Sequence, residues 1–202
     1  MSRPYRIVVQ KVVEQDIRAD DRSTLRLKLD PVLPEERLTE VLEQSLARHG
    51  WRRTADGVYE KERGEGESMT CDIEAREVTT VIEIEETVRH EVRKELRGDT
   101  WNWRQMREMT DEELEEVRRI EEARLEAEVS AEEHQRAASA LRETVRERLE
   151  SGADERRREV NRIVLEVMSE ALKERAGELG NVQHIDEKWD GEDYELTISV
   201  AE

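Results

Sequence analysis

Apolar and polar residues alternate along several short stretches of this chain. Leu25, Leu27 and Leu29, for example, are separated by single basic residues. Such alternation is typical of a β-strand with one face buried and the other in water. The same pattern predicts strands over residues 5–14, 23–29, 69–75, 79–87, 182–189 and 194–200.

A helix is predicted after the second of these stretches. Pro34 suits the start of a helix, and the acidic Glu35 and Glu36 favour its positive N-terminal end. Gly50 suits the position just after the last turn. The apolar stripe of this helix consists of Leu38, Val41, Leu42 and Leu46.

Two Asp-Gly pairs predict tight turns, because such turns need residues that accept a positive φ. Asp56–Gly57 separates the short β-prone runs 51–54 and 58–61, so this segment is predicted to be a hairpin. Asp190–Gly191 separates the last two predicted strands. Residues 64–68 are polar and are predicted to form a loop.

The pattern changes near Val88, where charged residues begin to dominate. Residues 88–97 are predicted to be helical, with a break at Gly98–Asp99. Thr110 and Glu113 then match a capping box, in which each side chain accepts a hydrogen bond from the backbone of the other residue.

Two long helical patterns follow the capping box. The first ends near Glu150 and the second covers residues 154–179. Ser151–Gly152 between them predicts a break or a turn. Because the heptad spacing is imperfect, the pattern is compatible with a helical hairpin or with a coiled-coil-like arm.

Together these elements predict an α+β fold, with a mostly antiparallel sheet built from N- and C-terminal segments and one packed helix. Residues 1–88 form the N-terminal part of an α+β head, and residues 89–180 form a long helical hairpin or coiled-coil-like insertion. Residues 181–202 form a β-hairpin that completes the head. We expect this hairpin to join the N-terminal sheet, because an isolated hairpin is only marginally stable in water.

The composition adds a thin core and an elongated shape to this picture. Hydrophobic residues make up 35% of the 202 residues, charged residues make up 43%, and there is no Phe. The formal net charge of −18 repels phosphate backbones and anionic lipids. General binding to nucleic acid or to membrane surfaces is therefore disfavoured.

Cysteine usage and hydropathy predict a soluble, cytoplasmic protein. Cys71 is the single cysteine and cannot form an intramolecular disulfide, which suits a reducing compartment. The N-terminal residues do not match a signal peptide. No apolar run approaches the roughly 20 residues that a membrane-spanning helix needs.

The search for catalytic chemistry finds no convincing constellation of residues. The four histidines have no metal-ligand spacing, and no Gly-rich phosphate loop is present. Cys71 lies in an alternating stretch and is predicted to be a core residue, while Glu83 and Glu85 are predicted on the wet face of a strand. We therefore predict a protein that is not an enzyme and needs no cofactor or metal. A carboxylate-based metal-dependent hydrolase is the alternative.

One segment is locally basic in this acidic protein and carries two tryptophans. Trp and Arg are the residues most enriched at binding hot spots. Three interpretations stay open: the tryptophans anchor the arm on the core of the head, the segment docks a protein, or it stacks on single-stranded nucleic acid. The candidate partner-binding residues are Arg89, Arg93, Arg97, Trp101, Trp103, Arg104 and Arg107.

Both ends of the chain resemble a bacterial family. The residues that carry the resemblance are 5–9, 18–21, 23–25, 33–35, 48–51, 170–176, 179–182 and 196–200. They are similar to the accessory "X" domain proteins of FtsH ternary systems, which are encoded alongside AAA+ ATPases and von Willebrand-A-type proteins. The similarity covers about half of the chain, and the charged residues 89–150 depart most from the family's pattern.

The resemblance implies a component of a bacterial, ATP-driven multiprotein assembly in which a partner handles the nucleotide. The family brings no established catalytic residues. Taken with the residues themselves, it predicts an adaptor or scaffold that binds an AAA+ ATPase, a von Willebrand-A-type protein, or a second copy of itself through the helical arm. Nucleic-acid binding through residues 89–107 is a further alternative.

Overall fold

The computed structural model describes residues 4–99, 101–102, 107–108, 110–189 and 194–201. The chain divides into two compact units. The ribbon unit consists of residues 1–19 and 84–144, and the core unit consists of residues 20–83 and 145–202. Each unit is described by itself below.

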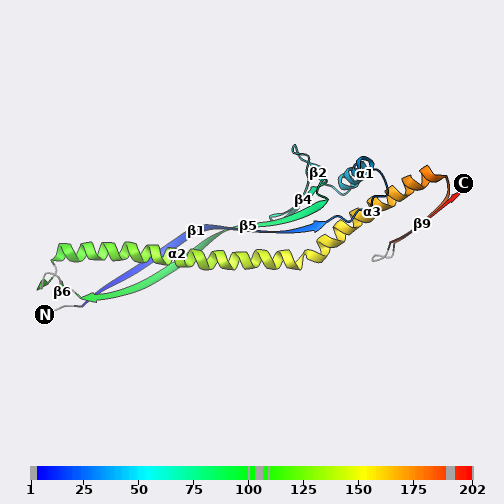
Figure 1. Cartoon of the computed structure of the whole chain (residues 1–202). Coiled ribbons are helices and arrows are strands. Elements are labelled where there is room, and N and C mark those ends of the chain that lie inside the picture. The colour runs from blue at the N-terminus through cyan, green and yellow to red at the C-terminus, as the bar shows by residue number, and fades with distance from the viewer. Residues whose placement is uncertain (1–3, 100, 103–106, 109, 190–193, 202) are drawn as a thin grey trace. The chain divides into compact units, whose positions relative to one another are not determined.

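Five strands form one antiparallel sheet (Figure 1). In spatial order they are β1 (Pro4–Arg26), β5 (Glu77–Asp99), β4 (Glu67–Asp72), β3 (Tyr59–Gly64) and β2 (Arg52–Arg53). The hydroxyls of Thr24 and Thr79 lie 3.1 Å apart, and Thr87 Oγ1 donates to Asp16 Oδ1 at 2.7 Å. A later residue of β5 thus pairs with an earlier residue of β1, which is the order that antiparallel strands require. The predicted α+β class with a mostly antiparallel sheet is confirmed.

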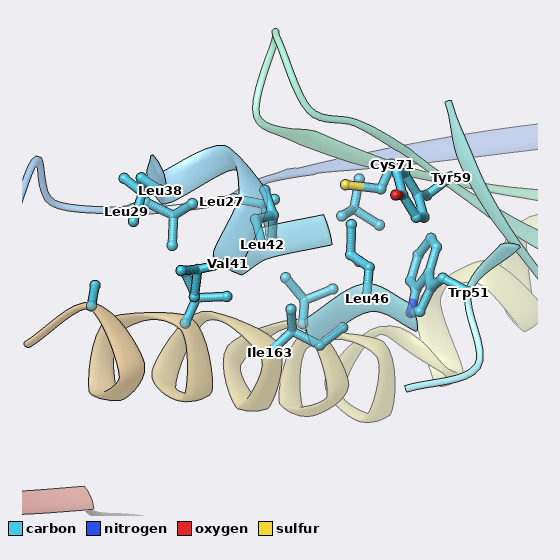
Figure 2. Packing of buried hydrophobic residues seen from close by; sticks show 14 of the residues in the cluster. Leu27, Leu29, Leu38, Val41, Leu42, Leu46, Trp51, Tyr59, Cys71 and Ile163 are labelled. Atoms are coloured by element: carbon cyan, nitrogen blue, oxygen red, sulfur yellow. The ribbon is translucent and has the colours of Figure 1, made fainter. Parts of the chain in front are cut away.

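The core unit buries one apolar cluster built from the sheet, α1 (Glu35–Arg48) and α3 (Ala153–Leu179). Figure 2 shows side chains from all three meeting in this cluster. Each fully buried Leu stabilises the fold by about 2 kcal/mol. The buried members are Leu27, Leu29, Leu33, Leu38, Val41, Leu42, Leu46, Trp51, Tyr59, Met69, Cys71, Val78, Val160, Ile163, Val167 and Ala171.

Helix α1 and the hairpin that follows it are as predicted. Pro34 precedes the helix, and Gly50 takes a φ of +81° after its C-cap. Strands β2 and β3 pair on either side of Asp56–Gly57, with Arg53 opposite Tyr59. The local signals for a helix start, a helix end and a tight turn were therefore sufficient here.

Residues 64–68, predicted to be a loop, form a tighter connection. Strand β3 ends at Gly64 and β4 begins at Glu67, so only Glu65 and Gly66 connect them. Both connecting residues have a positive φ, +51° and +75°. Two successive positive φ angles are what a type I′ hairpin turn requires.

Residues 88–97 were predicted to be a helix, and this prediction is wrong. They belong to β5, which continues through Gly98 to Asp99. The odd-numbered residues from Arg89 to Arg97 are all charged and all exposed, so exposed charges recur with a period of two. That period favours a strand, and pairing with β1 supplies the backbone hydrogen bonds.

The long helix α2 (Asp111–Ser151) begins with the predicted capping box. The backbone N–H of Thr110 donates to Glu113 Oε2 at 2.9 Å, and the N–H of Glu113 donates to Thr110 Oγ1 at 3.3 Å. Both donors lack a partner within the helix, so the box satisfies them reciprocally.

Gly152 separates α2 from α3 without reversing the chain. Its N–H donates to the carbonyl of Arg148 at 3.2 Å, and its carbonyl accepts from the N–H of Arg156 at 3.1 Å, so helical hydrogen bonding continues through it. The buried guanidinium of Arg156 donates to the carbonyl of Leu149. A Cβ atom on residue 152 would lie 2.4 Å from Arg156 Nη1, so glycine makes room for this guanidinium. The boundary predicted at Ser151–Gly152 is found at Gly152, which belongs to neither helix.

The C-terminal hairpin consists of β8 (Asn181–Trp189) and β9 (Tyr194–Ala201). We expected it to join the N-terminal sheet. Within the described residues it pairs only with itself and forms a separate two-stranded sheet. The turn predicted at Asp190–Gly191 lies outside the described residues.

Hydrogen bonds to α3 supply the support that an isolated hairpin lacks. Glu187 of β8 accepts from Ser169 Oγ at 3.2 Å, from Lys173 Nζ at 3.0 Å and from the hydroxyl of Tyr194. The Tyr194 hydroxyl, followed by Lys173, holds the pKa of Glu187 below its usual range. These bonds explain why the hairpin can form without the main sheet.

Among the described residues, no helix has an apolar stretch of sufficient length to cross a membrane.

Gly66 gives a direct test of the β3–β4 connection. A Cβ atom at this position would lie 2.0 Å from the carbonyl oxygen of Glu83, whereas a Cβ atom on Gly64, with a φ of +84°, would meet nothing within 4 Å. We expect Gly64→Ala to lower the free energy of unfolding by about 1 kcal/mol through backbone strain alone. We expect Gly66→Ala to lower it by about 3 kcal/mol, because steric overlap adds to that strain. Urea unfolding followed by circular dichroism measures both; equal losses would contradict the close approach.

Candidate protein-interaction surface

Three of the predicted partner-binding residues lie in one row on β5. Arg89, Arg93 and Arg97 are separated by three residues each and all are exposed. Side chains at alternate positions of a strand share a face, so these arginines project from the same side of β5. The structure therefore brings together the part of the candidate set that precedes Gly98.

The rest of the candidate set is described only in part. Trp101 belongs to β6 (Trp101–Asn102) and Arg107 to β7 (Arg107–Glu108), two short strands that pair with each other. Trp103 and Arg104 lie outside the described residues. The choice between core anchor and docking residue for the tryptophans stays a prediction.

Acidic residues alternate with the three arginines on β5. Glu91 and Glu95 are exposed between them, and we call the row Arg89, Glu91, Arg93, Glu95 and Arg97 the charged face. Arg97 Nε donates to Glu95 Oε1 at 2.8 Å, and Arg6 of β1 donates to Glu95 Oε2. These guanidinium groups, Arg97 first, hold the pKa of Glu95 below its usual range.

The neighbouring strand β1 adds apolar surface to the same side of the ribbon. Because Asp16 and Thr87 share a face, even-numbered residues of β1 lie on the side of odd-numbered residues of β5. Val8 and Val12 are such residues, and they are 37% and 46% exposed. Exposed apolar groups between paired charges are a feature of protein-binding surfaces.

The opposite side of the ribbon is covered by α2. Ile17 and Ala19 of β1 are buried, as are Val129 and Leu141 of α2. Gln15 Nε2 donates to Ser130 Oγ of the helix at 2.6 Å. A groove of about 450 Å³ lies between β5 and α2, lined by Ile84, Glu86, Val88, Glu133, Arg136, Ala137, Ala140, Leu141 and Thr144.

The edges of the ribbon are the feature that sequence reasoning missed. Strand β4 pairs with β5 only from Glu77 to Ile82, and the described part of the chain places only β1 beside β5 beyond that point. Strand β1 is the terminal strand of the sheet order. Backbone N–H and C=O groups along both edges are therefore available to another strand.

The residues considered for catalysis occupy structural positions. Cys71 is completely buried in the core cluster, and burial raises the pKa of its thiol to about 12. His49 caps α1, and its Nε2 lies 2.7 Å from Glu166 Oε2 of α3. The described residues contain no group of three or more His, Cys, Asp or Glu side chains that could hold a metal ion.

Fold and surface together define an α+β protein with a long helix and an exposed, charged β-ribbon. The chain belongs to the family FtsH ternary system domain X5, whose model matches residues 1–201. The resemblance found at the two ends is thereby confirmed, and it extends through the charged middle segment 89–150 that had seemed to depart from the family. Comparisons with curated proteins and with solved structures found no match.

The thiol of Cys71 provides a test of its structural role, because it is the single cysteine of the chain. A thiol whose pKa is about 12 is only about 0.01% ionised at pH 8, and the thiolate is the reactive form. We expect iodoacetamide at pH 8 to alkylate the folded chain at least about a thousandfold more slowly than the urea-unfolded chain. Mass spectrometry of quenched samples measures both rates. Rapid labelling of the folded chain would contradict this and would reopen the case for a nucleophile.

Proposed function

We propose that this protein is a non-enzymatic adaptor or scaffold of an FtsH ternary system and that it binds a protein partner through the charged face. The partner is the AAA+ ATPase or the von Willebrand-A-type protein of the same system, and the partner handles the nucleotide. Family membership supports the setting, and the charged face supports the mode of binding.

The observation that carries the proposal is the accumulation of basic side chains on an acidic protein. The chain has a net charge of −18, yet Arg89, Arg93 and Arg97 are exposed in one row. Arg6 adds a fourth guanidinium to the same side through its bond to Glu95. An opposing patch of carboxylates on a partner would be attracted to this row, and the acidic remainder of the surface would disfavour other orientations.

The shape of the charged face also favours a protein over a nucleic acid. The arginines are separated by glutamates, which repel a continuous phosphate backbone. A protein surface can place acidic groups opposite the arginines and basic groups opposite the glutamates. The exposed Val8 and Val12 offer apolar contact to such a partner. We place this role in the cytoplasm, because the single cysteine, Cys71, is a free thiol, which suits a reducing compartment.

The non-enzymatic part of the proposal is supported by what the reactive side chains do. The Cys71 thiol is buried and un-ionised at neutral pH, and His49 is occupied by Glu166. Both residues belong to the core unit, where Cys71 is part of the apolar cluster and His49 ends α1.

Partner capture with a matched pair of triple variants tests the proposal. The full chain is co-expressed with the AAA+ ATPase and the von Willebrand-A-type protein of its own system, and captured partner is quantified by mass spectrometry. We expect Arg89→Gln/Arg93→Gln/Arg97→Gln to lower capture by about tenfold, because each arginine ion pair at a solvent-exposed interface contributes on the order of 0.5 kcal/mol. Glutamine preserves most of the side-chain length while removing the charge.

The control removes three exposed arginines elsewhere, with Arg142→Gln, Arg158→Gln and Arg162→Gln combined. It changes the net charge by the same amount and should leave capture unchanged. Failure of the wild-type chain to capture either partner would contradict the adaptor role. Equal capture by the two triple variants would exclude the charged face as the binding surface, and capture replaced by single-stranded RNA or DNA would favour the nucleic-acid alternative.

A further inference from the structure

We propose that the open edge of β5 pairs with the same edge of a second copy of this chain, in antiparallel register about a two-fold axis at Val92. The result is a symmetric dimer with a continuous β1-β5-β5-β1 sheet. This inference goes beyond the proposed function, because it concerns the purified chain alone and needs no other partner.

The first argument is that this edge is long and unpaired. Strand β5 extends to Asp99, whereas its pairing with β4 stops at Ile82. Strand β4 is only six residues long, and the described residues place no further strand on this side of β5. A long exposed edge of this kind favours strand addition, because backbone hydrogen bonds form without any rearrangement of the sheet.

The second argument is that the charges of this edge are self-complementary. In a two-fold antiparallel pairing centred on Val92, the numbers of two residues that face each other add to twice 92. Glu91 then lies opposite Arg93, and Arg89 lies opposite Glu95, each pair occurring twice by symmetry. Opposite charges at directly facing positions stabilise a strand pair, and like charges destabilise it.

The third argument is that the alternative registers lose either charge complementarity or length. Moving the centre to Arg93 would place arginine against arginine and glutamate against glutamate along the whole row. A centre at Lys94 would keep opposite charges together, but β5 ends at Asp99, so the paired segment would shrink from residues 85–99 to residues 89–99. The longer pairing forms more backbone hydrogen bonds.

Charge swaps at Glu91 and Arg93 test both the dimer and its register. Sedimentation equilibrium of the full chain should give a species of twice the 23.8 kDa chain mass, at a concentration of about 100 µM. Arg93→Glu and Glu91→Arg, made separately, each place like charges opposite one another twice. Each should weaken dimerisation by about tenfold or more. The double variant Glu91→Arg/Arg93→Glu restores opposite charges and should restore the wild-type dissociation constant.

Arg175→Glu is the matched control, because Arg175 is an exposed residue of α3, in the core unit, and pairs with Glu178 of the same helix. It should leave the dissociation constant unchanged, and thermal unfolding of every variant reports on folding. A chain that sediments as a monomer overturns the proposal. A dimer whose dissociation constant is unchanged by the single swaps also overturns it, because association through the helices would behave in that way. A third contrary result is a double variant that does not recover the wild-type dissociation constant. Because the swaps also change the charged face, capture of the ATPase or the von Willebrand-A-type protein is judged from the glutamine variants and their control, and the two proposals fail separately.

Discussion

The structure depends on a mismatch of strand lengths. Strands β1 and β5 each span 23 residues, whereas β4 contributes six residues beside the first part of β5. The sheet therefore narrows from five strands to a two-stranded ribbon after Ile82. Helix α2 covers one side of that ribbon, and the row of charged β5 residues on the other side favours contact with water there. The open edge of β5 beyond Ile82 follows from this mismatch.

The core unit offsets a shortage of apolar residues with partly buried ion pairs. Arg63 of β3 pairs with Glu67, Glu155 and Glu159, and Lys61 donates to Glu159 at 2.6 Å. The side chains of Arg63 and Glu159 are 19% and 17% exposed, so water screens their attraction less than at the surface. With no Phe in the chain, these pairs fix the position of α3 on the sheet where apolar contact is thin.

Elements with a local signal could be predicted from the sequence, and elements decided by distant contacts could not. Pro34, Asp56–Gly57 and Thr110 each act within a few residues, and the elements they mark are where they were expected. Arginines spaced by four share one face of a helix and also one face of a strand, so the row from Arg89 to Arg97 could be recognised without knowing which element forms. In a helix the intervening glutamates would lie on the other side, and only the strand aligns all five charges. Burial of Arg156 beside its exposed neighbours depends on the space above Gly152, which no local pattern reveals.

The pairing of β1 with β5 sets an order of assembly. Contacts between these strands join residues 55 apart at Thr24 and Thr79, 71 apart at Asp16 and Thr87, and 89 apart at Arg6 and Glu95. The contact between Thr24 and Thr79 closes the shortest of these loops, next to the local hairpins of the core unit. Once it has formed, each further β1–β5 contact costs little additional loop-closure entropy. Pairing should therefore start there and spread outward one residue at a time. The beginning of β1, although it comes first in the chain, is then the last part of the sheet to close and the first to open.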